Sequence, residues 1–127
     1  MNSGFITQIK SQAVTLTPDN YELLVEGSKS LWVVQVYDST EKYCHYFAQF
    51  WEEFVQQYGD FVNFGRVDVW TQSDMLGYMP YRFQVFPSIY YIDKGEVGLC
   101  AFDFQKPDWS VRKCIEERYK ENLFKPI

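Results

Sequence analysis

The stretch that decides the fold is Leu31-Trp-Val-Val-Gln-Val-Tyr37, followed at once by Asp38-Ser-Thr-Glu-Lys-Tyr-Cys44. The first seven residues are mostly β-branched or aromatic, which is typical of a central strand covered on both faces. After the turn, apolar residues recur with the spacing of one helix face, at positions 44, 47, 48, 51, 54, 55 and 58. We therefore expect a buried strand that leads into an amphipathic helix over residues 39–58.

Strand and helix signals alternate along the rest of the chain. The expected strands are residues 13–16, 31–37, 62–69, 88–92 and 97–102. The expected helices are residues 17–27, whose inner face carries Tyr21, Leu24 and Val25, then 39–58, 73–78 and a final helix that opens at 106. This order predicts an α/β fold, in which a central mixed β-sheet carries helices on both faces.

Length and composition indicate one compact domain. The chain has 127 residues, of which 46% are hydrophobic and 20% aromatic. We expect residues 1–12 to form an N-terminal arm, residues 13–122 the domain, and residues 123–127 a C-terminal tail. The first residues carry no signal-peptide pattern, so a cytosolic protein and a domain of a longer precursor both remain open.

Charge and hydropathy exclude two classes of partner. The net charge of -5 argues against binding to nucleic acid, because phosphate neutralisation needs clustered Lys and Arg. No apolar run approaches the roughly 20 residues that span a bilayer, so we expect no membrane insertion by this segment. Three widely spaced cysteines fit no zinc cluster, so we expect no metal and no cofactor.

Several motifs occur in the order and spacing found in the thioredoxin and protein disulfide isomerase superfamily. The pieces are the strand end Val36-Tyr37, the helix with Ala48 and Trp51, Arg66-Val67-Asp68 and the turn Asp93-Lys94-Gly95-Glu96. The segment Tyr81-Arg-Phe-Gln-Val-Phe-Pro87-Ser88 resembles the family's Tyr-x-Val-x-x-Phe-Pro-Thr motif. Residues 13–121 thus resemble a thioredoxin-like domain, and the resemblance implies the thioredoxin topology.

The resemblance places Glu41-Lys42-Tyr43-Cys44 where redox-active members carry Cys-x-x-Cys. Disulfide exchange needs an exposed thiolate that attacks, and a carboxylate, Glu41, stands at the attacking position. Gln35 stands where such members commonly hold a buried acid that moves protons for the second thiol, and Gln cannot titrate. The resemblance therefore implies a redox-inactive domain.

The remaining residues of this motif have structural interpretations. Cys44 shares the apolar helix stripe with Phe47, Ala48 and Trp51, so we expect a buried, inert thiol. The alternative is monothiol disulfide exchange or a glutathione-linked activity through Cys44. We expect Glu41 to cap the helix, because Asp38-Ser39-Thr40-Glu41 resembles a capping box.

The other cysteines and the only histidine point to no catalytic site. For Cys100 and Cys114 we favour two packed thiols, with a bridge between them as the alternative. His45 points about 100° away from Cys44 on a helix, so we expect it at the surface rather than paired with the thiol.

The resemblance also implies a cis Phe86–Pro87 bond beside the motif, where the family pairs its backbone with extended peptide. The residues expected to contact peptide are Tyr43, Tyr46, Val85, Phe86 and Pro87, with Tyr37 and Trp70 near the same edge. Among these, helical spacing makes Tyr43 and Tyr46 the best exposed candidates.

Three functional hypotheses remain. The first is a non-catalytic thioredoxin-like domain that binds unfolded or partner polypeptide. It would be a monomeric module of a larger protein-folding factor, such as a disulfide isomerase relative or a J-domain chaperone, in the endoplasmic reticulum lumen. The second is the thiol chemistry of Cys44. The third is a cytosolic scaffold with the same fold.

Overall fold

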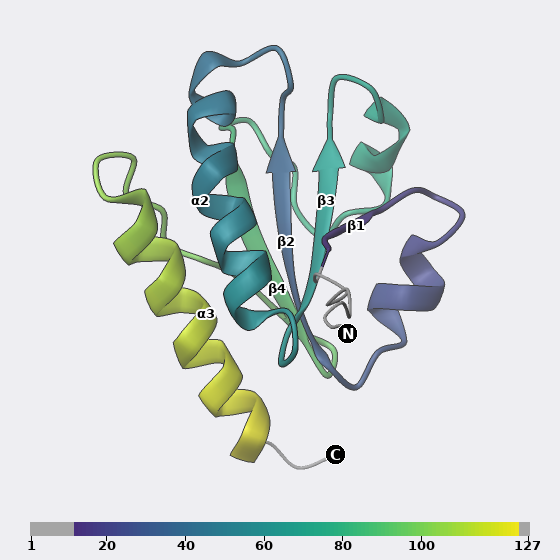
Figure 1. Ribbon diagram of the computed structural model, residues 1–127. Coiled ribbons are helices and arrows are strands. Elements are labelled where there is room, and N and C mark those ends of the chain that lie inside the picture. The colour runs from purple at the N-terminus through teal and green to yellow at the C-terminus, as the bar shows by residue number, and fades with distance from the viewer. Residues whose placement is uncertain (1–11, 125–127) are drawn as a thin grey trace, which may run out of the picture.

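The computed structural model describes residues 12–124, and its elements follow the expected order (Figure 1). The strands are β1 (Val14–Thr15), β2 (Leu31–Tyr37), β3 (Asn63–Asp68), β4 (Ser88–Asp93) and β5 (Glu96–Leu99). The helices are η1 (Glu22–Glu26), α2 (Lys42–Tyr58), η2 (Ser73–Gly77) and α3 (Pro107–Phe124). The expected N-terminal arm lies outside the described residues except for Gln12, and α3 extends into the first two positions of the expected tail.

The five strands form one mixed sheet in the order β1-β3-β2-β4-β5. β3 pairs in parallel with both β1 and β2, whereas β4 is antiparallel to β2 and β5. β2 is therefore the central strand, and six of its seven residues are buried. The predicted α/β fold with a central mixed sheet is confirmed.

The alternation of β2 divides its side chains between two cores. Val33 packs on the side of α2 and α3, with Phe47, Trp51 and Ile115. The buried residues of the opposite side are Leu16, Tyr21, Val25, Trp32, Val34, Val36, Val67, Met75, Met79, Tyr90 and Ile92. Helices thus cover both faces, with α2 and α3 side by side on one of them (Figure 1).

Two helical segments differ from the sequence prediction. The segment expected over 17–27 is a single π-helical turn, because Thr17 and Asn20 close a tight turn before it through a 2.9 Å bond from the Thr17 N–H to Asn20 Oδ1. In so short an element Leu24 does not reach the core and stays 37% exposed. The helix expected from residue 39 begins at Lys42, because the carboxylate of Asp38 holds a turn by accepting bonds from the Thr40 N–H and hydroxyl.

A disulfide joins Cys100 to Cys114, so the expectation of two packed thiols is wrong. Cys100 follows β5, and Cys114 lies three residues after Val111 on the inner face of α3. Their Cα atoms are 5.6 Å apart, within the range that a bridge needs. The bond ties the end of the hairpin to α3, and β5 stops at Leu99 instead of continuing to residue 102.

No helix within residues 12–124 combines the length and apolar character that a membrane crossing needs.

Candidate functional site

The degenerate motif lies where β2 ends and α2 begins. Glu41 occupies the N-cap position with extended backbone, at φ -84° and ψ 128°, but its side chain makes no capping hydrogen bond and is exposed. The predicted capping by Glu41 is therefore wrong. The carboxylate that orders this turn belongs to Asp38, which bonds the Thr40 N–H at 2.9 Å and the Thr40 hydroxyl at 2.6 Å.

Cys44 lies in the first turn of α2 and is the free cysteine of the described residues. Its side chain is 3% exposed, as the helical spacing predicts. Burial raises the pKa of the thiol, a backbone hydrogen bond from Asp38 lowers it, and the carboxylates of Glu41, Asp38 and Asp68 raise it further. At neutral pH the thiol is therefore mostly protonated, which makes it a poor nucleophile.

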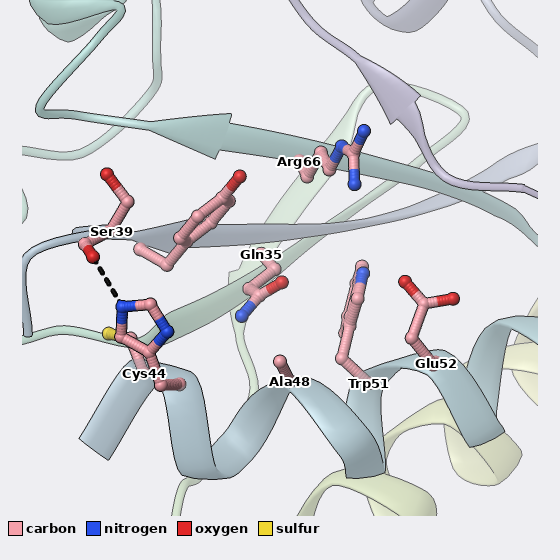
Figure 2. Close-up of a pocket in the computed structure, with 9 residues that line it drawn as sticks. Gln35, Ser39, Cys44, Ala48, Trp51, Glu52 and Arg66 are labelled. Carbon is pink, nitrogen blue, oxygen red and sulfur yellow. Dashed lines mark hydrogen bonds between the residues drawn. The ribbon is translucent and has the colours of Figure 1, made fainter. Parts of the chain in front are cut away.

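Gln35 lies in the middle of the sheet, in register with Arg66 on β3 and Ile89 on β4. It is 4% exposed, and its side chain extends from β2 toward α2 (Figure 2). An amide at this place can donate and accept hydrogen bonds but cannot exchange a proton.

Pro87 precedes β4 directly, and the Phe86–Pro87 peptide bond is cis, as the resemblance implies. Ser88 pairs with Val36, so the proline lies next to the end of β2 and the motif. No hydrogen bond joins the backbone of residues 82–86 to the backbone of another described residue. Val85 is 56% exposed, and the Val85 carbonyl accepts a 2.5 Å bond from the Ser88 hydroxyl. This segment therefore offers free N–H groups at the surface.

The aromatic residues of this region fall into separate groups. Tyr46 is exposed as expected, but Tyr43 is half-buried. The Tyr43 ring packs 5.0 Å from the Phe104 ring, and its hydroxyl donates a 2.6 Å bond to the Phe104 carbonyl. Phe86 instead packs against the core on the opposite side of the sheet. The structure therefore does not gather the five predicted peptide-contacting residues into one cluster.

Phe102 and Phe104, two aromatic residues that form part of this surface, were not identified from the sequence. Phe102 stacks on Phe104 at 4.8 Å and also packs 5.1 Å from Phe47 of α2. Their i, i+2 spacing suggests the end of a strand, and residue 102 was accordingly expected in one. This segment instead packs against α2. Trp70, which was predicted from the sequence to lie near this edge, is in the loop after β3 and is 68% exposed.

A cavity of about 130 Å³ opens between α2 and the β2–β3 pair (Figure 2). Its lining includes Gln35, Cys44 and Arg66, and Ala48 of α2 also borders it. Ala48 is exposed rather than part of the core, which corrects its expected place on the apolar stripe. His45 is at the surface as predicted, where its Nε2 bonds the Ser39 carbonyl at 2.6 Å.

Among the described residues, no group of three or more His, Cys, Asp or Glu is arranged to hold a metal ion.

A family model described as thioredoxin matches residues 12–117. The chain belongs to the thioredoxin family. No curated protein matches this member of the family.

Solved structures of thioredoxin-fold chains resemble it at low identity. The J-Trx1 fragment of ERdj5 has a TM-score of 0.73 at 19% identity, over 85% of this chain and 52% of that one. The thioredoxin of Malassezia sympodialis, Mala s 13, has a TM-score of 0.69 at 16% identity, over 87% and 93%. ERdj5 in crystal form II has a TM-score of 0.67 at 18% identity, over 86% and 15%. These likenesses show a shared fold, and this chain spans only a small part of ERdj5.

Proposed function

We propose that this thioredoxin-family domain is a non-catalytic module that binds unfolded or partner polypeptide beside the cis-proline. In this proposal the backbone of residues 82–86 acts as the edge to which an extended chain adds. The observation that carries it is the combination of backbone N–H groups without backbone partners at the Val85 edge with a motif that lacks its attacking thiol.

The absence of dithiol chemistry in the proposal rests on three residues. Glu41 stands at the helix N-terminus where an attacking thiolate would be needed. Cys44 is buried with a raised pKa, so its thiolate is scarce at neutral pH. The side-chain amide of Gln35 does not titrate, so it cannot relay a proton to or from a thiol. Each of these features independently weakens disulfide exchange.

Polypeptide binding is supported by the surface around Pro87. Strand addition uses main-chain N–H and C=O groups for affinity, and side-chain contacts for specificity. Val85 offers an exposed side chain beside a backbone N–H that has no backbone partner, and Trp70 offers an exposed ring on the loop after β3. In this proposal Tyr46 contributes at the rim, while Tyr43 serves mainly to position the segment around Phe104.

We further propose that the domain works in the endoplasmic reticulum lumen, as one monomeric module of a larger folding factor, with a cytoplasmic scaffold as the alternative. The disulfide between Cys100 and Cys114 supports an oxidising compartment, because such bonds are rare in cytosolic proteins. The likeness to ERdj5, of which this chain covers 15%, supports a multidomain parent.

The test is binding of a carboxymethylated, permanently unfolded protein to three forms of the domain. Val85→Pro removes the N–H donor, whereas Val85→Ala keeps the donor and loses only the side-chain methyl groups. We expect the proline variant to weaken binding about tenfold and the alanine variant less than threefold, with circular dichroism confirming that both fold. Equal affinities for all three forms would overturn strand addition at this edge.

Monothiol chemistry through Cys44 is the second candidate, because the thiol borders a cavity that opens to solvent. It requires rapid alkylation of Cys44 in the native protein and a mixed disulfide with glutathione, which mass spectrometry detects directly.

A further inference from the structure

Two polar side chains beside the cavity have no hydrogen-bond partner among the described residues. The indole N–H of Trp51 is buried without an acceptor, and Trp51 is 2% exposed. The side-chain amide of Gln35, a residue that is 4% exposed, forms no hydrogen bond with the described residues and extends toward the cavity (Figure 2). A buried donor left without a partner costs about 1–3 kcal/mol, so most such groups have one. Both residues line the same cavity.

Two opposite charges stand at the same cavity without pairing with each other. Arg66 reaches it from β3 and Glu52 from α2 (Figure 2). Neither residue takes part in the ion pair between Arg112 and Asp108. Arg66 uses its Nε to bond the Thr15 hydroxyl at 3.1 Å, which leaves its terminal nitrogens for another acceptor. The site thus presents one cation and one anion to whatever occupies it.

The cavity has room for a small organic molecule. Its volume of about 130 Å³ is roughly ten times the 10–15 Å³ that one water needs on the same measure. The room exists because Ala48 occupies the helix position between Cys44 and Trp51, where a larger side chain would fill the space (Figure 2).

We propose that this cavity binds a small zwitterion, a carboxylate next to an ammonium group, with glycine as the simplest example. The carboxylate accepts hydrogen bonds from Arg66 and the Gln35 amide, and it lies beside the Trp51 ring. The ammonium group lies against Glu52. This arrangement gives the Gln35 amide a partner and uses both charges, whereas a simple anion would meet repulsion from Glu52. The zwitterion binds at a different surface from the Val85 edge, so this site is additional to the one proposed for polypeptide.

The test is a titration of the ¹⁵N-labelled protein with glycine, followed through the indole N–H signals of its four tryptophans at constant ionic strength. Trp51→Phe identifies the Trp51 signal. We expect this signal to shift saturably, while the Trp32, Trp70 and Trp109 signals stay in place. Acetate and methylammonium should each bind at least fivefold more weakly than glycine.

Two variants test the charges of Arg66 and Glu52. Both residues lie at the rim of the cavity rather than in the core. Arg66→Gln and Glu52→Gln should each weaken glycine binding at least fivefold, and Glu52→Gln should bring acetate level with glycine. Lys29→Gln, which removes an exposed cation elsewhere, should leave binding unchanged. The proposal is overturned by an unsaturable or absent shift, by equal binding of acetate and glycine to the natural protein, or by unchanged binding in Arg66→Gln. Polypeptide binding by these variants, measured in parallel, reports separately on the Val85 edge.

Discussion

Gln35 on β2 lies in register with Arg66 on β3, and both side chains line one cavity beside Cys44. In redox-active members that the sequence resembles, the position of Gln35 holds an acid that shuttles protons. An uncharged amide beside a guanidinium carries out no such transfer, but the pair can hold a ligand in place. We therefore propose that the interior of the site serves binding rather than proton transfer.

Cys44 should react slowly with alkylating reagents. Because burial raises the pKa of its thiol, the thiolate is scarcer at pH 7 than in an unstructured peptide. We expect iodoacetamide to label the native protein at least tenfold more slowly than the protein unfolded in guanidinium, with the native rate still rising above pH 9. Labelling at the rate of a free peptide thiol would support the monothiol hypothesis instead.

Restoring the missing thiol should restore chemistry. Glu41 is exposed at the N-cap of α2, so Glu41→Cys places a thiol where the helix terminus lowers thiol pKa values. Combined with Gln35→Glu, it should reduce insulin disulfides at least tenfold faster than the natural domain. Glu41→Ser with the same second change is the matched control, and it should stay at the background rate. An inactive double variant would show that more than these two positions has been lost.

The disulfide between Cys100 and Cys114 should contribute strongly to stability. It closes a loop with a sequence separation of 14, for which the chain-entropy estimate is about 3 kcal/mol. Replacing both cysteines by alanine should lower the free energy of unfolding in urea by about that amount, and added dithiothreitol should destabilise the natural protein but not the variant. A loss below about 0.5 kcal/mol would mean that the bridge constrains little.

Asp68 should make the domain sensitive to acid. Burial raises the pKa of its carboxyl, but hydrogen bonds from Ser39, Trp70 and Thr71 outweigh this effect, and the net pKa lies below the usual value. A lowered folded-state pKa contributes stability above the unfolded pKa near 3.8, and this contribution is lost as the pH falls through the folded value. Asp68→Asn should cost about 1.5 kcal/mol at pH 7 and flatten the unfolding profile below pH 4. If the free energy of unfolding of Asp68→Asn still falls as steeply below pH 4, the acid sensitivity comes from other groups.

The strands and long helices were predictable because their signals are local. The run from Leu31 to Tyr37 specifies a buried strand by composition alone, and the stripe beginning at Cys44 specifies α2. The disulfide was ranked below two packed thiols because it depends on how α3 packs beside β5, which spacing in the sequence does not report.

The incorrect predictions for Glu41 and Ala48 have a similar cause. Glu41 was expected to cap α2, but Asp38 orders the turn first and leaves Glu41 to solvent. Ala48 has the periodicity of a core residue, yet it borders a cavity, because the sheet opposite presents Gln35 rather than a large apolar side chain. Helical periodicity identifies the face of a helix, but what fills the space opposite is a tertiary property.

The most direct test of the central claim is amide hydrogen exchange at Val85 and Phe86, with and without a saturating unfolded polypeptide. In the free domain these N–H groups have no backbone partner and should exchange rapidly. If an extended chain adds to this edge, exchange at Val85 should slow at least tenfold on binding, while amides of α3 stay unchanged. Binding that leaves exchange at both residues unaltered would contradict the account.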